Sequence, residues 1–109
     1  MRETKERVQD VLEAIERIER RVGMGWPTFE SDEMLQVWVL HHLQIIGEAC
    51  RAMPEGFRTQ HPKVPWPRII GMRHILVHHY FDIDTRLVWS TVVDDLPPLK
   101  SAVIDILRE

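Results

Sequence analysis

Five side chains able to bind or transfer protons lie close together in the middle of this chain: Arg73, His74, His78, His79 and Tyr80. Arginine can hold phosphate oxygens bidentately and stabilise charge that develops in a transition state. Histidine titrates near neutral pH, so it can accept a proton from a ribose 2′-hydroxyl or donate one to a leaving oxygen. RNA contains that internal nucleophile and DNA does not. These residue types therefore indicate metal-independent cleavage of an RNA phosphodiester.

The spacing of these residues constrains how they can cooperate. Arg73 and His78 are five positions apart, which is about 140° around an ideal helix, so they share a helix face poorly. His74 and His78 are four positions apart and do share a face. For Arg73 and His78 to act on one phosphate, either the helix deforms locally or a second subunit completes the site. A two-fold dimer would place two such sets in one cleft.

Apolar residues recur at helical spacing along most of the chain, and no run of residues has the alternation of a strand. The sequence therefore predicts an all-α fold, an up-and-down bundle of four to five helices, in a single domain over residues 1–109. The expected long helices cover about 3–22, 32–53 and 67–82, and two shorter ones follow. The expected N-terminal caps are Asp32 or Ser31 for the second helix, Asp82 or Asp84 for the fourth, and Asp95 for the last, with Pro97 and Pro98 in its opening turn.

Charge is unevenly distributed along the chain, whose formal net charge is −3. Residues 51–80 contain five basic residues and one acidic residue, whereas the remainder is strongly acidic. A basic zone on an acidic body suits an anionic ligand that is met at one site. Cys50 is the single cysteine, the first residues are charged, and no apolar run reaches membrane-spanning length. We therefore expect a cytoplasmic protein without a membrane partner.

The pattern Arg73-x4-His78-x-Tyr80 resembles the R-x4-H-x-Y motif of HepT-like toxins, which belong to the HEPN superfamily. The resemblance covers about residues 5–109. Further stretches look like family landmarks in family order: Ile45-Ile46-Gly47-Glu48-Ala49, Pro62-x3-Trp66-x3-Ile70-x2-Met72-Arg73, Tyr80-Phe81-Asp82-Ile83-Asp84, and Val88-Trp89 through Asp95-Leu96-Pro97.

The resemblance implies a homodimeric endoribonuclease toxin of a type II toxin–antitoxin system that needs no metal or other cofactor. It implies that Arg73 and His78 are catalytic at a cleft between subunits. It also implies a cognate nucleotidyltransferase antitoxin of the MNT type, which modifies the tyrosine matching Tyr80 with AMP. The residue after the arginine is commonly asparagine in the family and is His74 here. His79 offers a second histidine one position later, so His78 or His79 could be the main acid or base.

Two alternative functions use the same residues. His74 and His78 have the one-face spacing of paired metal ligands, and Glu48 could join them from a neighbouring helix. The chain could also be a non-catalytic HEPN subunit that binds nucleotide or docks a nucleotidyltransferase, because binding and catalysis would both need Arg73 and His78.

A purely structural interpretation is also open. Arg73 could form a salt bridge with Asp82 or Asp84, and the histidines could line a dimer contact. In the catalytic interpretation, by contrast, His74 and His79 would assist and Glu48 would be an orienting carboxylate. For His41 and His42 on the second helix, the favoured explanation is a wet flank or a satisfied hydrogen bond.

Overall fold

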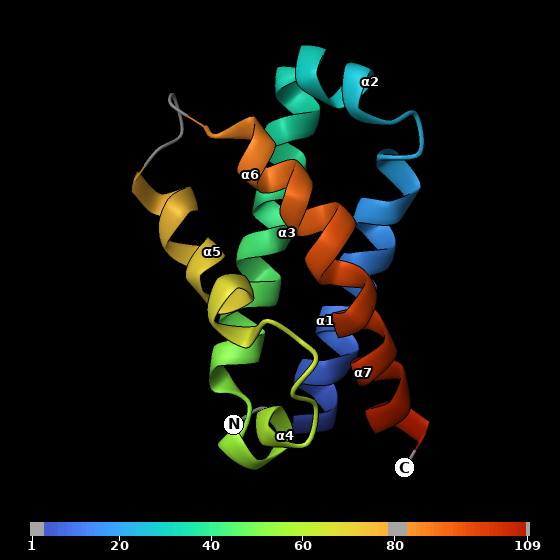
Figure 1. Ribbon diagram of the computed structural model, residues 1–109, viewed down its shortest axis with the longest axis vertical. Coiled ribbons are helices and arrows are strands. Elements are labelled where there is room, and N and C mark those ends of the chain that lie inside the picture. Colours follow the sequence, from blue (N-terminus) through green and yellow to red (C-terminus); the bar gives the residue numbers. More distant parts are fainter. Residues whose placement is uncertain (1–3, 79–82, 109) are drawn as a thin grey trace.

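The computed structural model describes residues 4–78 and 83–108, except the side chains of residues 75–78. Four long helical elements run alternately up and down in this structure. The part of the chain so described contains helices and no strand, which confirms the predicted all-α bundle (Figure 1). The elements in order are α1 (Thr4–Arg21), α2 (Trp26–Ser31), α3 (Glu33–Ala52), α4 (Glu55–Thr59), α5 (Trp66–His78), α6 (Thr85–Ser90), the π-helix η1 (Thr91–Asp95) and α7 (Leu96–Arg108).

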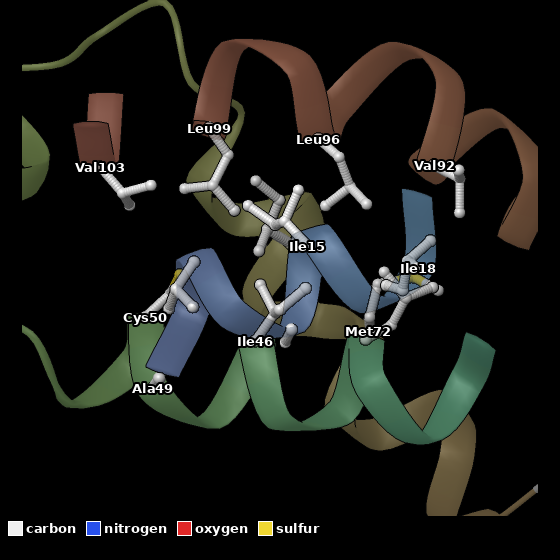
Figure 2. Packing of buried hydrophobic residues seen from close by; sticks show 14 of the residues in the cluster. Ile15, Ile18, Ile46, Ala49, Cys50, Met72, Val92, Leu96, Leu99 and Val103 are labelled. Carbon is white, nitrogen blue, oxygen red and sulfur yellow. The ribbon is translucent and has the colours of Figure 1, made fainter. Parts of the chain in front are cut away.

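The core lies where α1, α3 and α7 meet, and α5 closes it on the other side of α3 (Figures 1 and 2). Helix α1 contributes a fully buried stripe at helical spacing, which the sequence pattern predicts. Helix α3 is buried on more than one face and packs against both α1 and α5, so it is the central helix. Buried side chains that Figure 2 labels include Ile15, Ile18, Ile46, Leu96, Leu99 and Val103.

The start of α3 follows its predicted signal. The Asp32 carboxylate accepts a hydrogen bond from the backbone N–H of Leu35 at 3.0 Å, so Asp32 is the N-terminal cap. Ser31, the alternative cap, instead donates to carbonyls within α2. Helix α2 itself lies where only a short link is expected from the sequence. It begins after Gly25, whose φ of +84° is in the left-handed region that glycine adopts without strain.

The prediction that Asp95 caps a separate last helix is wrong. Residues 85–108 form one continuous helical rod, and Asp95 lies in its π-helical turn. The cause is the pair Pro97 and Pro98, because a proline ring clashes with the carbonyl four residues earlier. Widening the preceding turn relieves that clash, and the N–H of Leu96 bonds to the carbonyl of Thr91, five residues back. Asp84 does cap α6, by accepting from the N–H of Leu87.

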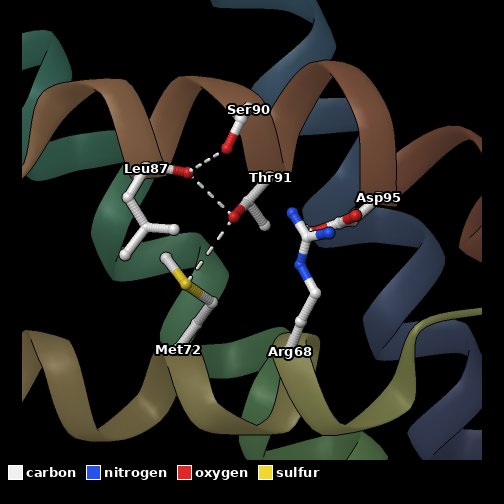
Figure 3. A network of polar contacts seen from close by, with 6 residues as sticks. All are labelled: Arg68, Met72, Leu87, Ser90, Thr91 and Asp95. Carbon is white, nitrogen blue, oxygen red and sulfur yellow. Dashed lines mark hydrogen bonds and ion pairs between the residues drawn. The ribbon is translucent and has the colours of Figure 1, made fainter.

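The π-helical turn directs two polar side chains toward α5 (Figure 3). The buried Thr91 hydroxyl lies 3.7 Å from the sulfur of Met72, and the buried Asp95 carboxylate forms an ion pair with Arg68 at 3.3 Å. These contacts tie the last rod to α5. None of the described helices combines the length and the apolar character needed to cross a membrane.

Candidate active site

The candidate site is built where α3 and α5 cross as antiparallel neighbours (Figure 1). Gly47 on α3 makes this close crossing possible. A Cβ atom at position 47 would lie 3.0 Å from the carbonyl oxygen of Ile69 and 3.4 Å from the backbone nitrogen of Arg73. The backbones of α3 and α5 therefore approach each other closely at the level of Arg73, and this approach fixes the position of the Arg73 Cα atom.

The Arg73 side chain extends across this crossing to the carboxylate of Glu48 on α3. Its Nη1 donates to Oε1 of Glu48 at 3.0 Å. The Arg73 side chain is 23% exposed and the Glu48 side chain 52% exposed. An ion pair this open to solvent adds little stability, because water screens it. Its main consequence is geometric, since it orients the guanidinium from a half-buried position.

One donor of the Arg73 guanidinium has no acceptor among the described residues. The Nε–H is buried and makes no hydrogen bond there. Leaving a buried donor unpaired typically costs about 1–3 kcal/mol, and more when the group is charged. An oxyanion brought to this guanidinium would supply the missing acceptor and also balance its charge. The arrangement is therefore suited to hold a phosphate.

The other predicted site residues follow Arg73 in the sequence. His74 lies on α5 and is exposed. Helix α5 is described as far as His78, whose side chain lies outside the described residues, as do His79 and Tyr80 altogether. The convergence of Arg73 with His78 thus stays a prediction from the sequence. Among the predicted site residues whose side chains the structure describes, Arg73 and Glu48 are the two that it brings into contact.

The structural alternative for Arg73 differs from what is observed. Glu48 is the carboxylate that pairs with Arg73, whereas Asp84 is used to cap α6 and Asp82 lies outside the described residues. As for the metal-site alternative, the described residues contain no group of three or more His, Cys, Asp or Glu side chains that could hold a metal ion.

The remaining titratable groups near α3 have structural explanations. His41 is exposed, and Nδ1 of the buried His42 lies 2.8 Å from the carbonyl oxygen of Trp38, as expected for a wet flank and a satisfied hydrogen bond. Burial raises the pKa of Cys50 to about 12, with the nearby charge of Arg58 opposing the rise. A thiol of this kind stays protonated at neutral pH and is unsuited to act as a nucleophile.

The sequence did not lead us to predict why position 47 is a glycine, or that Asp95 is a buried ion-pair partner. A glycine inside an apolar helical pattern is itself a signal of close backbone approach, and it could have pointed to the α3–α5 crossing. Asp95 gave no comparable signal, because an acidic residue just before two prolines is also the usual pattern of a helix cap.

Comparisons with known proteins identify the family that this chain resembles. A model of the HepT-like family, described as "Ribonuclease HepT-like", matches residues 11–106. The chain is 40% identical to "Putative RNase TTE0752" of Caldanaerobacter subterraneus subsp. tengcongensis over 84% of this chain and 82% of that protein. It is also 40% identical to "Probable ribonuclease HepT" of Thermococcus cleftensis over 91% of each chain.

A third relative is "Putative RNase MJ1380" of Methanocaldococcus jannaschii, which is 39% identical over 94% of both chains. No solved structure matches the chain. The family match spans nearly all of the four-element bundle, including the α3–α5 crossing that holds Arg73 and Glu48. The chain therefore belongs to the HepT-like ribonuclease family of the HEPN superfamily.

Proposed function

We propose that this protein is a metal-independent endoribonuclease and the toxin of a type II toxin–antitoxin system. The observation that carries the proposal is the Arg73 guanidinium, which is half-buried, oriented by Glu48, and left with one buried N–H that lacks an acceptor among the described residues. A phosphate oxygen satisfies both the charge and the free donor of such a group. The family match supports RNA as the substrate.

In the proposed reaction the ribose 2′-oxygen attacks the adjacent phosphorus, and the bond to the 5′-oxygen of the next nucleotide breaks. His78 takes the 2′-hydroxyl proton or protonates the leaving 5′-oxygen, with His74 and His79 assisting. Arg73 binds the phosphate oxygens and stabilises the charge that accumulates on them, while Glu48 keeps the guanidinium in place. The products are a 2′,3′-cyclic phosphate and a free 5′-hydroxyl, so water, metal and cofactor are not consumed in this step.

The partners and regulation follow from the same family resemblance. We propose that residues 1–109 act as one domain in a cytoplasmic homodimer, with the site in a cleft between subunits. An MNT-type nucleotidyltransferase antitoxin would silence the enzyme by transferring AMP to Tyr80. Adding an AMP group two positions from His78 would introduce negative charge where a phosphate must bind, which explains inhibition electrostatically.

The test is cleavage of a labelled RNA in EDTA by the wild type, Arg73→Ala, His78→Ala and His79→Ala. We expect losses of at least about 10²-fold for Arg73→Ala and His78→Ala, as for removal of an oxyanion donor or a general acid or base. Glu48→Gln keeps a hydrogen-bond acceptor and should lose less activity. Arg108→Ala, which removes an exposed arginine of α7, is the matched control and should cleave normally.

A substrate with 2′-deoxyribose at the scissile position checks the chemistry, because it lacks the nucleophile and should resist cleavage. Full activity of Arg73→Ala, or cleavage of the deoxy substrate, would contradict the proposal. If nothing cleaves RNA while nucleotide binding depends on Arg73, the chain is instead a non-catalytic HEPN adaptor subunit.

A further inference from the structure

A groove between α1 and α3 adjoins the candidate active site. It has a volume of about 620 Å³, and Glu48, which holds the Arg73 guanidinium, is one of the residues that line it. Ala49 and Ala52 also line the groove, and their short side chains leave space that longer ones would fill. A volume of this size is typical of ligand sites in proteins. The groove therefore offers room for a ligand that extends from Arg73 across α3.

Two arginines line one end of this groove from opposite helices. Helices α1 and α3 run antiparallel (Figure 1), and Arg7 lies near the start of α1, whereas Arg51 lies near the end of α3. Arg51 is exposed and Arg7 is half-buried, and no ion pair between described residues involves either of them. Two guanidinium groups without counter-charges repel each other, and an anion bound between them relieves that repulsion.

The carboxylates of the groove lie toward its other end. Asp10 follows Arg7 by three positions on α1, and Glu48 precedes Arg51 by three positions on α3, so each lies almost one helical turn from its arginine. Glu48 is already paired with Arg73, which balances its charge. The end that Arg7 and Arg51 form is therefore the part of the groove that attracts an anion.

Arg51 also lies close to the position where Arg73 would bind a phosphate. On a helix, residues three positions apart have Cβ atoms about 5–6 Å apart, which is the separation expected for Glu48 and Arg51. Nη1 of Arg73 lies 3.0 Å from Oε1 of that same Glu48. This separation is comparable with the spacing of successive phosphates along one nucleic acid strand. A strand whose phosphate is held by Arg73 can therefore place its next phosphate at Arg51.

We propose that Arg7 and Arg51 form a second phosphate site, which binds the backbone phosphate next to the scissile one. This inference deepens the proposed function and rests on it. Guanidinium groups hold phosphate oxygens through charge-assisted hydrogen bonds, and contacts to phosphate fix the position of a strand without reading its bases. Arg7 and Arg51 are thus positioning residues, because they lie away from the bond that breaks. The enzyme consequently favours substrates with at least two phosphates, whatever their base sequence.

The first experiment compares short substrates that each contain one ribose, at the scissile position, so that only one bond can be cleaved. One is a dinucleotide with a single phosphate, and two are trinucleotides with the additional phosphate on the 5′ or the 3′ side. For the wild type, kcat/KM should be at least about tenfold higher for one of the trinucleotides than for the dinucleotide, as expected for an added charge-assisted contact.

The variants then show whether the two arginines cause this preference. Arg51→Ala and Arg7→Ala should each lower the trinucleotide-to-dinucleotide ratio to less than about threefold. Arg51→Lys keeps the charge without the bidentate geometry and should retain an intermediate ratio. Arg20→Ala, which removes an exposed arginine of α1 that does not line the groove, is the matched control and should keep the wild-type ratio. A wild type without the preference, or an Arg51→Ala ratio equal to that of the wild type, would overturn the inference.

The second experiment measures binding alone, with an oligonucleotide that has 2′-deoxyribose at every position that could be cleaved. Arg51→Ala should reduce the magnitude of the slope of log K against log salt concentration by about 0.7, the value for one phosphate contact in a single strand. Arg20→Ala should leave the slope unchanged. An unchanged slope for Arg51→Ala would refute a phosphate contact at this position.

These outcomes separate the second phosphate site from the proposed chemistry. If the wild type cleaves no RNA, or Arg73→Ala cleaves it normally, while Arg51→Ala lowers the salt slope, the proposed function fails and the phosphate site stands. If Arg73→Ala is inactive but Arg51→Ala matches the wild type in both the ratio and the slope, the proposed function stands and the second site is refuted.

Discussion

At the scale of single residues, two arginines on α5 meet carboxylates in opposite environments. Arg73 pairs with the half-exposed Glu48, in a contact that water screens and a phosphate can enter. Arg68 pairs with Asp95, whose side chain is almost fully buried. The ion pair to Asp95 is not accompanied by a hydrogen bond to the same oxygen. The first pair is suited to binding a ligand, and the second connects two elements at an energetic cost.

Asp95 yields a prediction for pH dependence. Burial raises the pKa of Asp95, with Arg68 opposing the rise and Asp94 adding to it. Because the folded pKa is above the unfolded value, its contribution to stability is full at pH below the unfolded pKa and is lost as the pH rises through the folded pKa. Asp95→Asn cannot ionise, so its unfolding midpoint relative to the wild type should increase from pH 4 to pH 7.

Thermal unfolding across that pH range measures the effect. Asp105→Asn, on the exposed side of α7, is the control, and its midpoint relative to the wild type should change much less. A difference between Asp95→Asn and the wild type that stays constant with pH would show that ionisation of Asp95 does not oppose folding.

At the scale of elements, the geometry of the site depends on how closely α3 and α5 cross. A Cβ added at Gly47 would meet backbone atoms of Ile69, Ile70 and Arg73 at 3.0 to 3.4 Å, and backbone atoms cannot move aside as a flexible side chain could. The π-helical turn also contacts α5, through Thr91 and Asp95 (Figure 3). Helix α5 is thus held by contacts to two elements near the level where Arg73 begins.

Gly47→Ala should therefore destabilise the protein, by about 1–3 kcal/mol in the free energy of unfolding, because overpacking against backbone outweighs the better helix propensity of alanine. The control is Gly71→Ala on α5, where an added Cβ meets nothing within 4 Å. That variant should be more stable by about 0.5–1 kcal/mol. Urea unfolding of both variants measures these changes in the free energy of unfolding. A stabilised Gly47→Ala would mean that α3 and α5 can move apart freely.

At the scale of the whole molecule, an overall negative charge surrounds a basic middle region. The formal net charge is −3, yet residues 51–80 hold five basic residues and one acidic residue. Such a molecule repels nucleic acid over most of its surface and attracts it at one place. Binding of RNA should consequently depend on a few phosphate contacts rather than on a long basic track.

Salt dependence measures that number of contacts. For single strands the slope of log K against log salt concentration is about −0.7 per phosphate contact, so we expect a slope between about −1 and −4. Fluorescence anisotropy with a short non-cleavable RNA from 50 to 300 mM salt would give the value. A slope near zero would contradict an electrostatic site, and a much steeper one would indicate a larger surface than the basic region offers.

The sequence by itself determined the helical bundle, most helix ends and the family, because these depend on local signals. Apolar residues at a period of 3.6 define each buried stripe, Asp32 and Asp84 cap their helices, and the Arg73-x4-His78-x-Tyr80 motif is contiguous. Local signals failed at Asp95, where a capping residue and a buried ion-pair partner look the same. Only the tertiary structure decided that two prolines widen a continuous helix, and that Gly47 lets α5 close on α3. It also showed that Glu48 meets Arg73, because that contact joins residues 25 positions apart and depends on how the helices pack.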